Sequence, residues 1–186
     1  MKIYVLRHEL RTESPLFFTS LTQEGLNNSE KLKNLLNEID FDVIYTSPFL
    51  RTIQTILPYC KQFNKKFNIE YSLYECTNDK RFNKDNYHYS YIDLKKHLPN
   101  IDNYVNPVYY PLIDKIVFPE TANTYKKRLF DFSEFVINKY QNSNKKILFV
   151  THMSPVIDYL KTYKKEFHTF YNEGKVSLLY DSENKI

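Results

Sequence analysis

The sequence predicts an α/β protein: a three-layer sandwich with a mostly parallel central sheet, helices on both faces of that sheet and a small inserted cap. Two observations support this fold class. Short apolar runs of the kind that form buried strands alternate with longer segments of helical periodicity, and this alternation is typical of parallel sheets. Residues 76–118 interrupt it and are rich in Asn, Asp, Tyr, Lys and Pro, which predicts a cap or lid rather than core.

The length of the chain, 186 residues, suits one hydrophobic core and is rather short for two. We therefore expect a single domain over residues 1–186, with residues 76–118 inserted in it. Five runs are predicted as strands: residues 2–6, 42–45, 67–71, 146–150 and 175–180.

Four segments are predicted as helices. Thr22 is suited to be the N-cap of a helix that ends near Ile39. Ser47 can cap a second helix and Pro48 suits its first position, so this helix should start there and run to about Phe63. Two more helices are expected, at residues 121–140 and 154–163.

Charge, cysteine content and hydropathy narrow the function classes. Lys and Arg number 26 against 22 Asp and Glu, a modest +4 that is spread along the chain, so no nucleic-acid partner is expected. Cys60 and Cys76 match neither a zinc motif nor a disulfide framework, which favours a reducing compartment. No run approaches the roughly 18 apolar residues of a membrane span, and the chain enters a strand-like run directly. We therefore expect a cytoplasmic protein with no membrane partner.

Histidines follow two of the predicted strands. Arg7-His8 closes the first apolar run, and Thr151-His152 closes another more than a hundred residues downstream. In open α/β sheets the carboxyl ends of the strands line the ligand crevice. The two histidines can therefore face each other across one site, which predicts a catalytic arrangement.

Five short blocks occur in order along the chain. They are Leu6-Arg7-His8, Leu21-Thr22-Gln23-Glu24-Gly25, the run from Tyr45 to Thr55, Leu73-Tyr74-Glu75 and Val150-Thr151-His152. Together they resemble the histidine phosphatase superfamily, also called phosphoglycerate mutase-like. The blocks are spread over most of the chain, and mainly residues 76–118 lie outside the part that they span. A lone Arg-His pair carries little information, whereas five blocks in this order are a strong signal.

The resemblance implies a phosphohistidine mechanism. His8 matches the nucleophile, His152 the second histidine of the pocket and Glu75 the proton donor of many members. Arg7 and Arg51 match arginines that bind phosphate. These residue types suit the reaction, because the transferred phosphoryl group must mainly be positioned and neutralised, and arginine forks do this through bidentate hydrogen bonds. Since cationic side chains take the role of a metal, we expect no metal and no cofactor.

Further residues are assigned to the same pocket. Arg11 stands three residues past the first histidine, a placement similar to histidine acid phosphatases, and we infer that it adds a third arginine. Met153 precedes a predicted helix, whose free backbone N–H groups can bind an anion. Glu120 and Arg128 resemble a glutamate and a following arginine on a segment that borders the pocket in the family.

The sequence also departs from the family pattern. Glu9 stands where glycine usually follows the first histidine, and a carboxylate there would repel a dianionic substrate unless it points away or pairs with Arg7 or Arg11. Met153 stands where glycine is common. Ser14 occupies the position at which many mutases and cofactor-type phosphatases of the family carry asparagine.

We expect a metal-independent phosphomonoester hydrolase that acts on a small phosphorylated substrate or a phosphopeptide, as a monomer or a homodimer. One alternative is a phosphoglycerate-mutase-type phosphotransferase, although such mutases are usually longer. Another is a pseudophosphatase that binds phospho-ligands with little turnover, which Glu9 and Met153 motivate. A zinc site of His8, His152 and Glu75 is the metal alternative, but no helical His-x-x-x-His pair or cysteine cluster supports it.

Overall fold

The computed structural model of the chain describes residues 1–78, 80–164 and 172–183. Its middle layer is a five-stranded sheet in the order β3-β2-β4-β1-β5. The strands are β1 (Lys2–Arg7), β2 (Val43–Thr46), β3 (Asn68–Ile69), β4 (Lys146–Thr151) and β5 (Val176–Asp181). β5 pairs antiparallel with β1, while the other pairings are parallel, so the sheet is mostly parallel as predicted.

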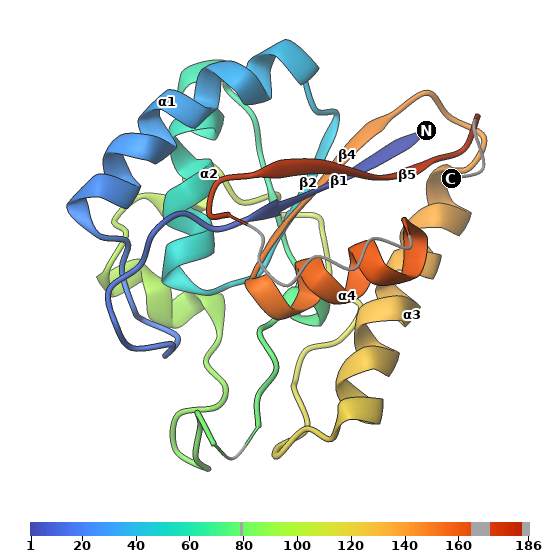
Figure 1. The fold of residues 1–186 in the computed structure, drawn as a ribbon. Coiled ribbons are helices and arrows are strands. Elements are labelled where there is room, and N and C mark those ends of the chain that lie inside the picture. Colours follow the sequence, from blue (N-terminus) through green and yellow to red (C-terminus); the bar gives the residue numbers. More distant parts are fainter. Residues whose placement is uncertain (79, 165–171, 184–186) are drawn as a thin grey trace.

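Helices cover both faces of the sheet, which confirms the three-layer prediction (Figure 1). α1 (Gln23–Ile39) and α2 (Leu50–Phe63) pack together on one face, where their apolar side chains join a core cluster with Leu148 and Val150 of β4. α3 (Ala122–Tyr140) and α4 (Met153–Tyr163) cover the other face in a second cluster with Phe149. Within the described residues, no helix is long and apolar enough to cross a membrane.

The segment 76–118 contains two short 3₁₀ helices, η2 (Tyr91–Lys96) and η3 (Ile101–Asn103). Several of its apolar side chains, among them Phe82, Leu94 and Ile116, are buried in the cluster that α1 and α2 share. The segment is therefore anchored on the core of the sheet. Its assignment as an inserted cap stays a prediction.

β3 is shorter than the predicted run of residues 67–71. A third 3₁₀ helix, η1 (Tyr71–Leu73), begins where the strand was expected to continue. The Glu70 side chain caps it by accepting a hydrogen bond of 2.8 Å from the backbone N–H of Ser72. This local side-chain contact competes with the strand ladder and ends β3 early.

The start of α2 also differs from the prediction. The helix begins at Leu50 rather than Pro48, and its N-cap residue makes no side-chain cap hydrogen bond. Ser47 does not cap it, because its hydroxyl lies 2.9 Å from His152 Nε2, while its backbone N–H donates to the Val150 carbonyl at 3.0 Å and continues the β2–β4 pairing beyond the strand.

The predicted N-cap of α1 is confirmed. The Thr22 hydroxyl accepts a hydrogen bond of 3.0 Å from the Gly25 N–H, and the Thr22 N–H donates to the Leu10 carbonyl at 2.9 Å. A Cβ placed on Gly25 would lie 2.2 Å from the Leu10 carbonyl oxygen. The missing side chain of Gly25 therefore lets α1 close against the loop that follows β1.

Gly25→Ala should destabilise the fold, because its methyl group would meet the Leu10 carbonyl oxygen. We expect the free energy of unfolding to fall by about 1–3 kcal/mol in urea denaturation. Asn34→Ala, at an exposed position of the same helix, is the matched control and should change this quantity by less than about 0.5 kcal/mol. Equal free energies of unfolding of the two variants would show that the loop after β1 moves away from the added methyl group without loss of stability.

Candidate active site

The two histidines meet at the carboxyl ends of β1 and β4. These neighbouring parallel strands pair with Arg7 opposite Thr151, so His8 and His152 are the next residue on each. The His8 N–H donates to the Thr151 carbonyl at 2.9 Å, and the two imidazole centroids lie 5.3 Å apart. Both side chains are buried. The register of the sheet thus brings together the two residues that the sequence singled out.

Hydrogen bonding fixes the protonation of the His8 ring. Its Nδ1 lies 2.7 Å from the Glu9 carbonyl oxygen, and because a carbonyl can only accept, Nδ1 carries the proton. Burial, together with the charge of Arg51, lowers the pKa of His8 well below its usual 6.5, so the ring is neutral at neutral pH. Its Nε2 then holds a lone pair, which is what a nucleophilic histidine requires.

His152 is held by a residue whose role the sequence analysis missed. Its Nε2 lies 2.9 Å from the Ser47 hydroxyl, and its ring packs edge-on against Phe49 with centroids 4.6 Å apart. Burial, with the charges of Arg51 and His8, lowers the pKa of His152 well below 6.5. Its Nδ1 is buried without a hydrogen-bond partner in the part of the chain that the structure describes. Ser47 directly follows β2, which pairs with β4, and this position was the signal in the sequence that could have predicted the contact.

The positive charge of Arg51 acts on both histidines and lowers the pKa of each. It lies in the first turn of α2, is 1% exposed, and its guanidinium carbon sits 4.4 Å from the Phe49 ring centroid. Its Nη1 donates to the Leu16 carbonyl at 2.8 Å, whereas its Nε has no hydrogen-bond partner among residues 1–78, 80–164 and 172–183. Burial lowers its pKa to about 9, and the carboxylate of Glu75 partly offsets this. A buried cation with an unused donor is suited to bind an anion.

Arg7, the residue before His8, forms an ion pair with a carboxylate. Its Nη2 is 2.5 Å from Glu173 Oε1 in an ion pair. Burial lowers the pKa of Arg7, while the charges of Glu173 and Glu75 raise it. A cavity of about 370 Å³ is lined by Arg7, Arg11 and Glu173, among other residues.

Arg11 uses one arm of its guanidinium within its own loop. Its Nη1 donates to the carbonyl oxygens of residues 12, 13 and 14. Its charge also contributes to the lowered pKa values of His8 and Arg51. Its role as a third phosphate ligand stays a prediction.

Glu75 follows η1 and is buried. One carboxylate oxygen accepts a hydrogen bond of 3.1 Å from the backbone N–H of Cys76. The charge of Glu75 raises the pKa of both Arg7 and Arg51, which shows that the carboxylate lies near both arginines. The structure therefore places the predicted proton donor beside the predicted phosphate ligands.

Glu120 and Arg128 form a buried bidentate ion pair, with Nε–Oε1 at 2.5 Å and Nη2–Oε2 at 2.8 Å. Arg128 also donates to three carbonyl oxygens of residues 72–75 at 2.8 to 3.2 Å. Glu120 Oε2 additionally accepts hydrogen bonds of 2.9 Å from the N–H and the hydroxyl of Thr77. Because both of its oxygens are occupied, Glu120 supports Arg128, and Arg128 holds the backbone that carries Glu75.

The carboxylate of Glu9 lies between α1 and the turn before β5. Asn28 of α1 lies 3.5 Å from its Oε2, and a Cβ placed on Gly174 would lie 1.8 Å from its Oε1. The Glu9 N–H donates to the Thr55 hydroxyl at 3.0 Å. Burial raises the pKa of this carboxyl group. These contacts fit the first of the two conditions stated from the sequence, that the side chain points away from a bound phosphate.

α4 begins at Met153, with His152 as its N-cap residue and no side-chain cap hydrogen bond. The first N–H groups of a helix have no partner within it, so those of Met153 and Ser154 are directed toward the end of the helix beside His152. Their contact with a ligand stays a prediction.

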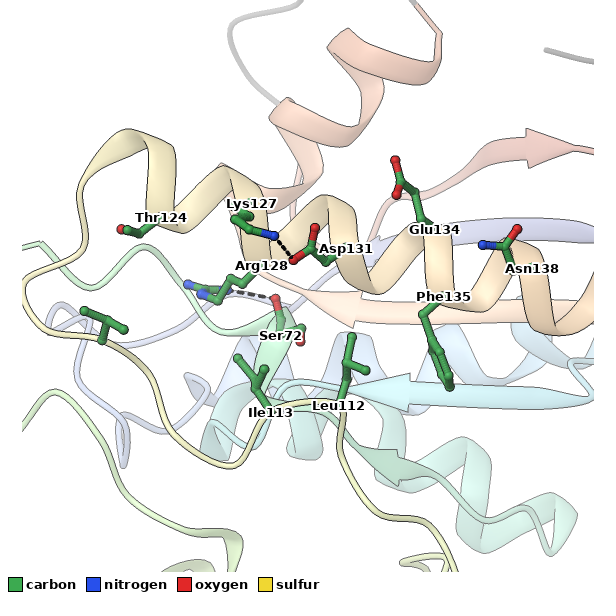
Figure 2. A pocket seen from close by; sticks show the side chains of 11 residues that line it. Ser72, Leu112, Ile113, Thr124, Lys127, Arg128, Asp131, Glu134, Phe135 and Asn138 are labelled. Atoms are coloured by element: carbon green, nitrogen blue, oxygen red, sulfur yellow. Dashed lines mark hydrogen bonds and ion pairs between the residues drawn. The ribbon is translucent and has the colours of Figure 1, made fainter.

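Two other cavities lie apart from the histidines. One, of about 700 Å³, lies between α3 and residues 112–117, with Leu112 and Ile113 opposite Lys127 and Asp131 (Figure 2). The other, of about 410 Å³, is lined by residues 69–71, 90–92 and 105–114. Arg128 lines the first cavity, whereas the predicted catalytic residues line neither. In the ranges described, no three His, Cys, Asp or Glu side chains are grouped to hold a metal ion, so the alternative zinc set is not formed.

Glu120→Gln should strongly destabilise the protein, because it leaves the Arg128 charge buried without its counter-charge. We expect the free energy of unfolding to fall by about 3 kcal/mol in chemical denaturation. Asp131→Asn is the matched control, since it breaks the exposed Lys127–Asp131 pair of the same helix and should cost less than about 1 kcal/mol. A similar small cost for both substitutions would contradict the structural role of the buried pair.

Comparison with known proteins connects this arrangement to a family. Residues 17–165 match the profile of the histidine phosphatase superfamily, branch 1. No curated protein sequence matches the chain. Three of the similar solved structures are phosphatases, and they show the shared fold at low sequence identity.

The first is the ecdysone phosphate phosphatase from Bombyx mori in complex with tungstate, with 14% identity, a TM-score of 0.69, and 97% of this chain and 92% of that one covered. The α-ribazole phosphatase from Shigella flexneri has 17% identity and a TM-score of 0.65, with 96% and 89% covered. A phosphoserine phosphatase variant from Entamoeba histolytica in complex with phosphoserine has 17% identity and a TM-score of 0.62, with 94% and 88% covered. Since the profile match spans most of the chain and the fold is shared over nearly all of it, this chain belongs to the histidine phosphatase superfamily.

Proposed function

We propose that this chain is a metal-independent phosphomonoester hydrolase that works through a phosphohistidine on His8. The observation that carries the proposal is a set of unused nitrogens after β1 and β4 and in the first turn of α2. Arg51 Nε and His152 Nδ1 are buried without partners in the described ranges, and His8 Nε2 holds a lone pair beside them. A phosphate group would satisfy both buried nitrogens with its oxygens and present phosphorus to the nucleophile.

In the first step His8 Nε2 attacks phosphorus, and the bond from phosphorus to the leaving oxygen breaks. The Glu9 carbonyl holds Nδ1–H, so the ring keeps its orientation while its charge rises. Glu75 gives its proton to the leaving oxygen. We take the Ser47 hydroxyl as the donor to His152 Nε2, 2.9 Å away, which leaves the His152 proton on Nδ1 to bind a phosphate oxygen.

The peripheral phosphate oxygens carry most of the charge in the transition state, so their neutralisation is the main task of the site. Arg51 and Arg7 supply guanidinium groups, Arg11 adds charge from the adjacent loop, and the start of α4 at Met153 adds backbone N–H groups. In the second step Glu75 takes a proton from water, the water oxygen attacks phosphorus, and the bond to His8 breaks. The site then returns to its starting state.

The position of Glu9 favours turnover over binding alone. A carboxylate aimed at the phosphate would have weakened any phosphatase, but this one is held beside Asn28 and Gly174. The three similar enzymes are named for different phosphorylated compounds, so the shared fold does not select one of them. We therefore propose a small phosphorylated molecule or a phosphopeptide as the substrate class.

The nucleophile is tested by hydrolysis of p-nitrophenyl phosphate in EDTA. Wild-type protein should turn over and form an acid-labile, base-stable phosphoenzyme, whereas His8→Ala should lose at least about a thousandfold in kcat and form none. The control is His97→Ala, which replaces an exposed histidine at the C-terminal end of η2 and should retain activity. Activity that survives in His8→Ala, or that EDTA abolishes, would contradict the mechanism.

The role of Glu75 is tested by the leaving group. Glu75→Gln cannot supply the proton, so kcat/KM for an alkyl phosphomonoester should fall by about 10²–10⁴. The loss for p-nitrophenyl phosphate should be much smaller, because its leaving group departs without protonation. Equal losses for the two substrates would mean that Glu75 positions the arginines and does not act as the proton donor.

A further inference from the structure

The turn of residues 172–174, which leads into β5, contacts the end of β1, directly before His8. Glu173 forms its ion pair with the Arg7 side chain, and the Gly174 N–H donates to the Arg7 carbonyl at 3.1 Å. Gly174 also lies against the Glu9 carboxylate and has a φ of +67°. A side chain at this glycine would be strained and would collide with Glu9. Three contacts therefore fix where the Glu173 carboxylate lies.

The Glu173 carboxylate is paired with Arg7, the arginine that the proposed mechanism assigns to phosphate binding. A carboxylate and a phosphate present similar pairs of oxygens to a guanidinium fork, so the two compete for the same donors. The pair is only partly shielded, with Arg7 14% and Glu173 29% exposed, and it borders the cavity of about 370 Å³ beside Arg11. A ligand can therefore reach the pair from solvent.

We propose that Glu173 is a built-in competitor for the phosphate group and sets the affinity of the site for phosphorylated ligands. Its carboxylate leaves Arg7 when phosphate binds and returns when phosphate departs. Since substrate and inorganic phosphate carry the same group, Glu173 weakens the binding of both and speeds release of the product. This inference rests on the proposed function, because it requires Arg7 to be a phosphate ligand.

A purely structural role for Glu173 predicts the opposite effect. If the ion pair only orients Arg7 toward the site, removal of the carboxylate charge would release the guanidinium and weaken phosphate binding. Competition instead predicts that removal of the charge strengthens binding, because no carboxylate has to be displaced and no like charge faces the phosphate. The sign of the change separates the two roles.

The experiment compares wild-type protein with Glu173→Gln, using inorganic phosphate as the probe in isothermal titration calorimetry. Glutamine keeps the size of the side chain and removes its charge. We expect Kd for phosphate to decrease roughly three- to tenfold and KM for p-nitrophenyl phosphate to decrease with it. Glu13→Gln removes the same charge from the lining of the same cavity and should change Kd by less than about twofold. Thermal unfolding of each variant checks that the fold is retained.

Phosphate affinity that is unchanged or weaker in Glu173→Gln, while wild-type protein binds phosphate and turns over, would overturn the inference and leave the hydrolase intact. Absence of phosphate binding in both proteins would overturn it together with the assignment of Arg7. Tighter phosphate binding without turnover or phosphoenzyme would support the inference and contradict the proposed hydrolase.

Discussion

The alignment of β1, β4 and β2 at their carboxyl ends is the constraint on which the site depends. Hydrogen bonds from His8 N–H to the Thr151 carbonyl and from Ser47 N–H to the Val150 carbonyl continue these pairings one residue past the strands. The residue after each strand therefore lies at the same edge, which is how segments from distant parts of the chain meet. A shift of one residue in either pairing would turn the side chains at this edge to the opposite face.

The buried arginines Arg128 and Arg51 differ in how many of their guanidinium N–H groups are hydrogen-bonded. Arg128 is buried, and its guanidinium is satisfied by both oxygens of Glu120 and by backbone carbonyls, which is typical of a cation that supports structure. Arg51 is still more completely buried but keeps an Nε without a hydrogen-bond partner in the described residues, and burial lowers its pKa to about 9. Folding thus retains an incompletely compensated charge at the centre of the site. Its cost is consistent with a role in ligand binding rather than in stability.

Local patterns in the sequence predicted the strands, the helices and the Thr22 cap, because these depend on apolar periodicity and on neighbouring side chains. The start of α2 was predicted wrongly, since Ser47 is claimed by a tertiary contact with His152 that no local signal reveals. The roles of Glu120 and Glu9 could not be predicted, because they depend on hydrogen-bond partners from distant parts of the sequence. Motif order could point to the residues of the site, whereas their hydrogen-bond partners required the three-dimensional arrangement.

The direction of β5 determines which end of the sheet the last part of the chain reaches. Because β5 runs antiparallel to β1, the turn that precedes it arrives at the edge where β1 ends, beside Arg7. A parallel strand in that place would have begun at the opposite edge. During synthesis, Arg7 is made before β2, β3 and β4, and Glu173 follows only after these strands. The Arg7 side chain therefore lacks the Glu173 counter-charge until the first four strands have been made, and the ion pair can form only as β5 is added.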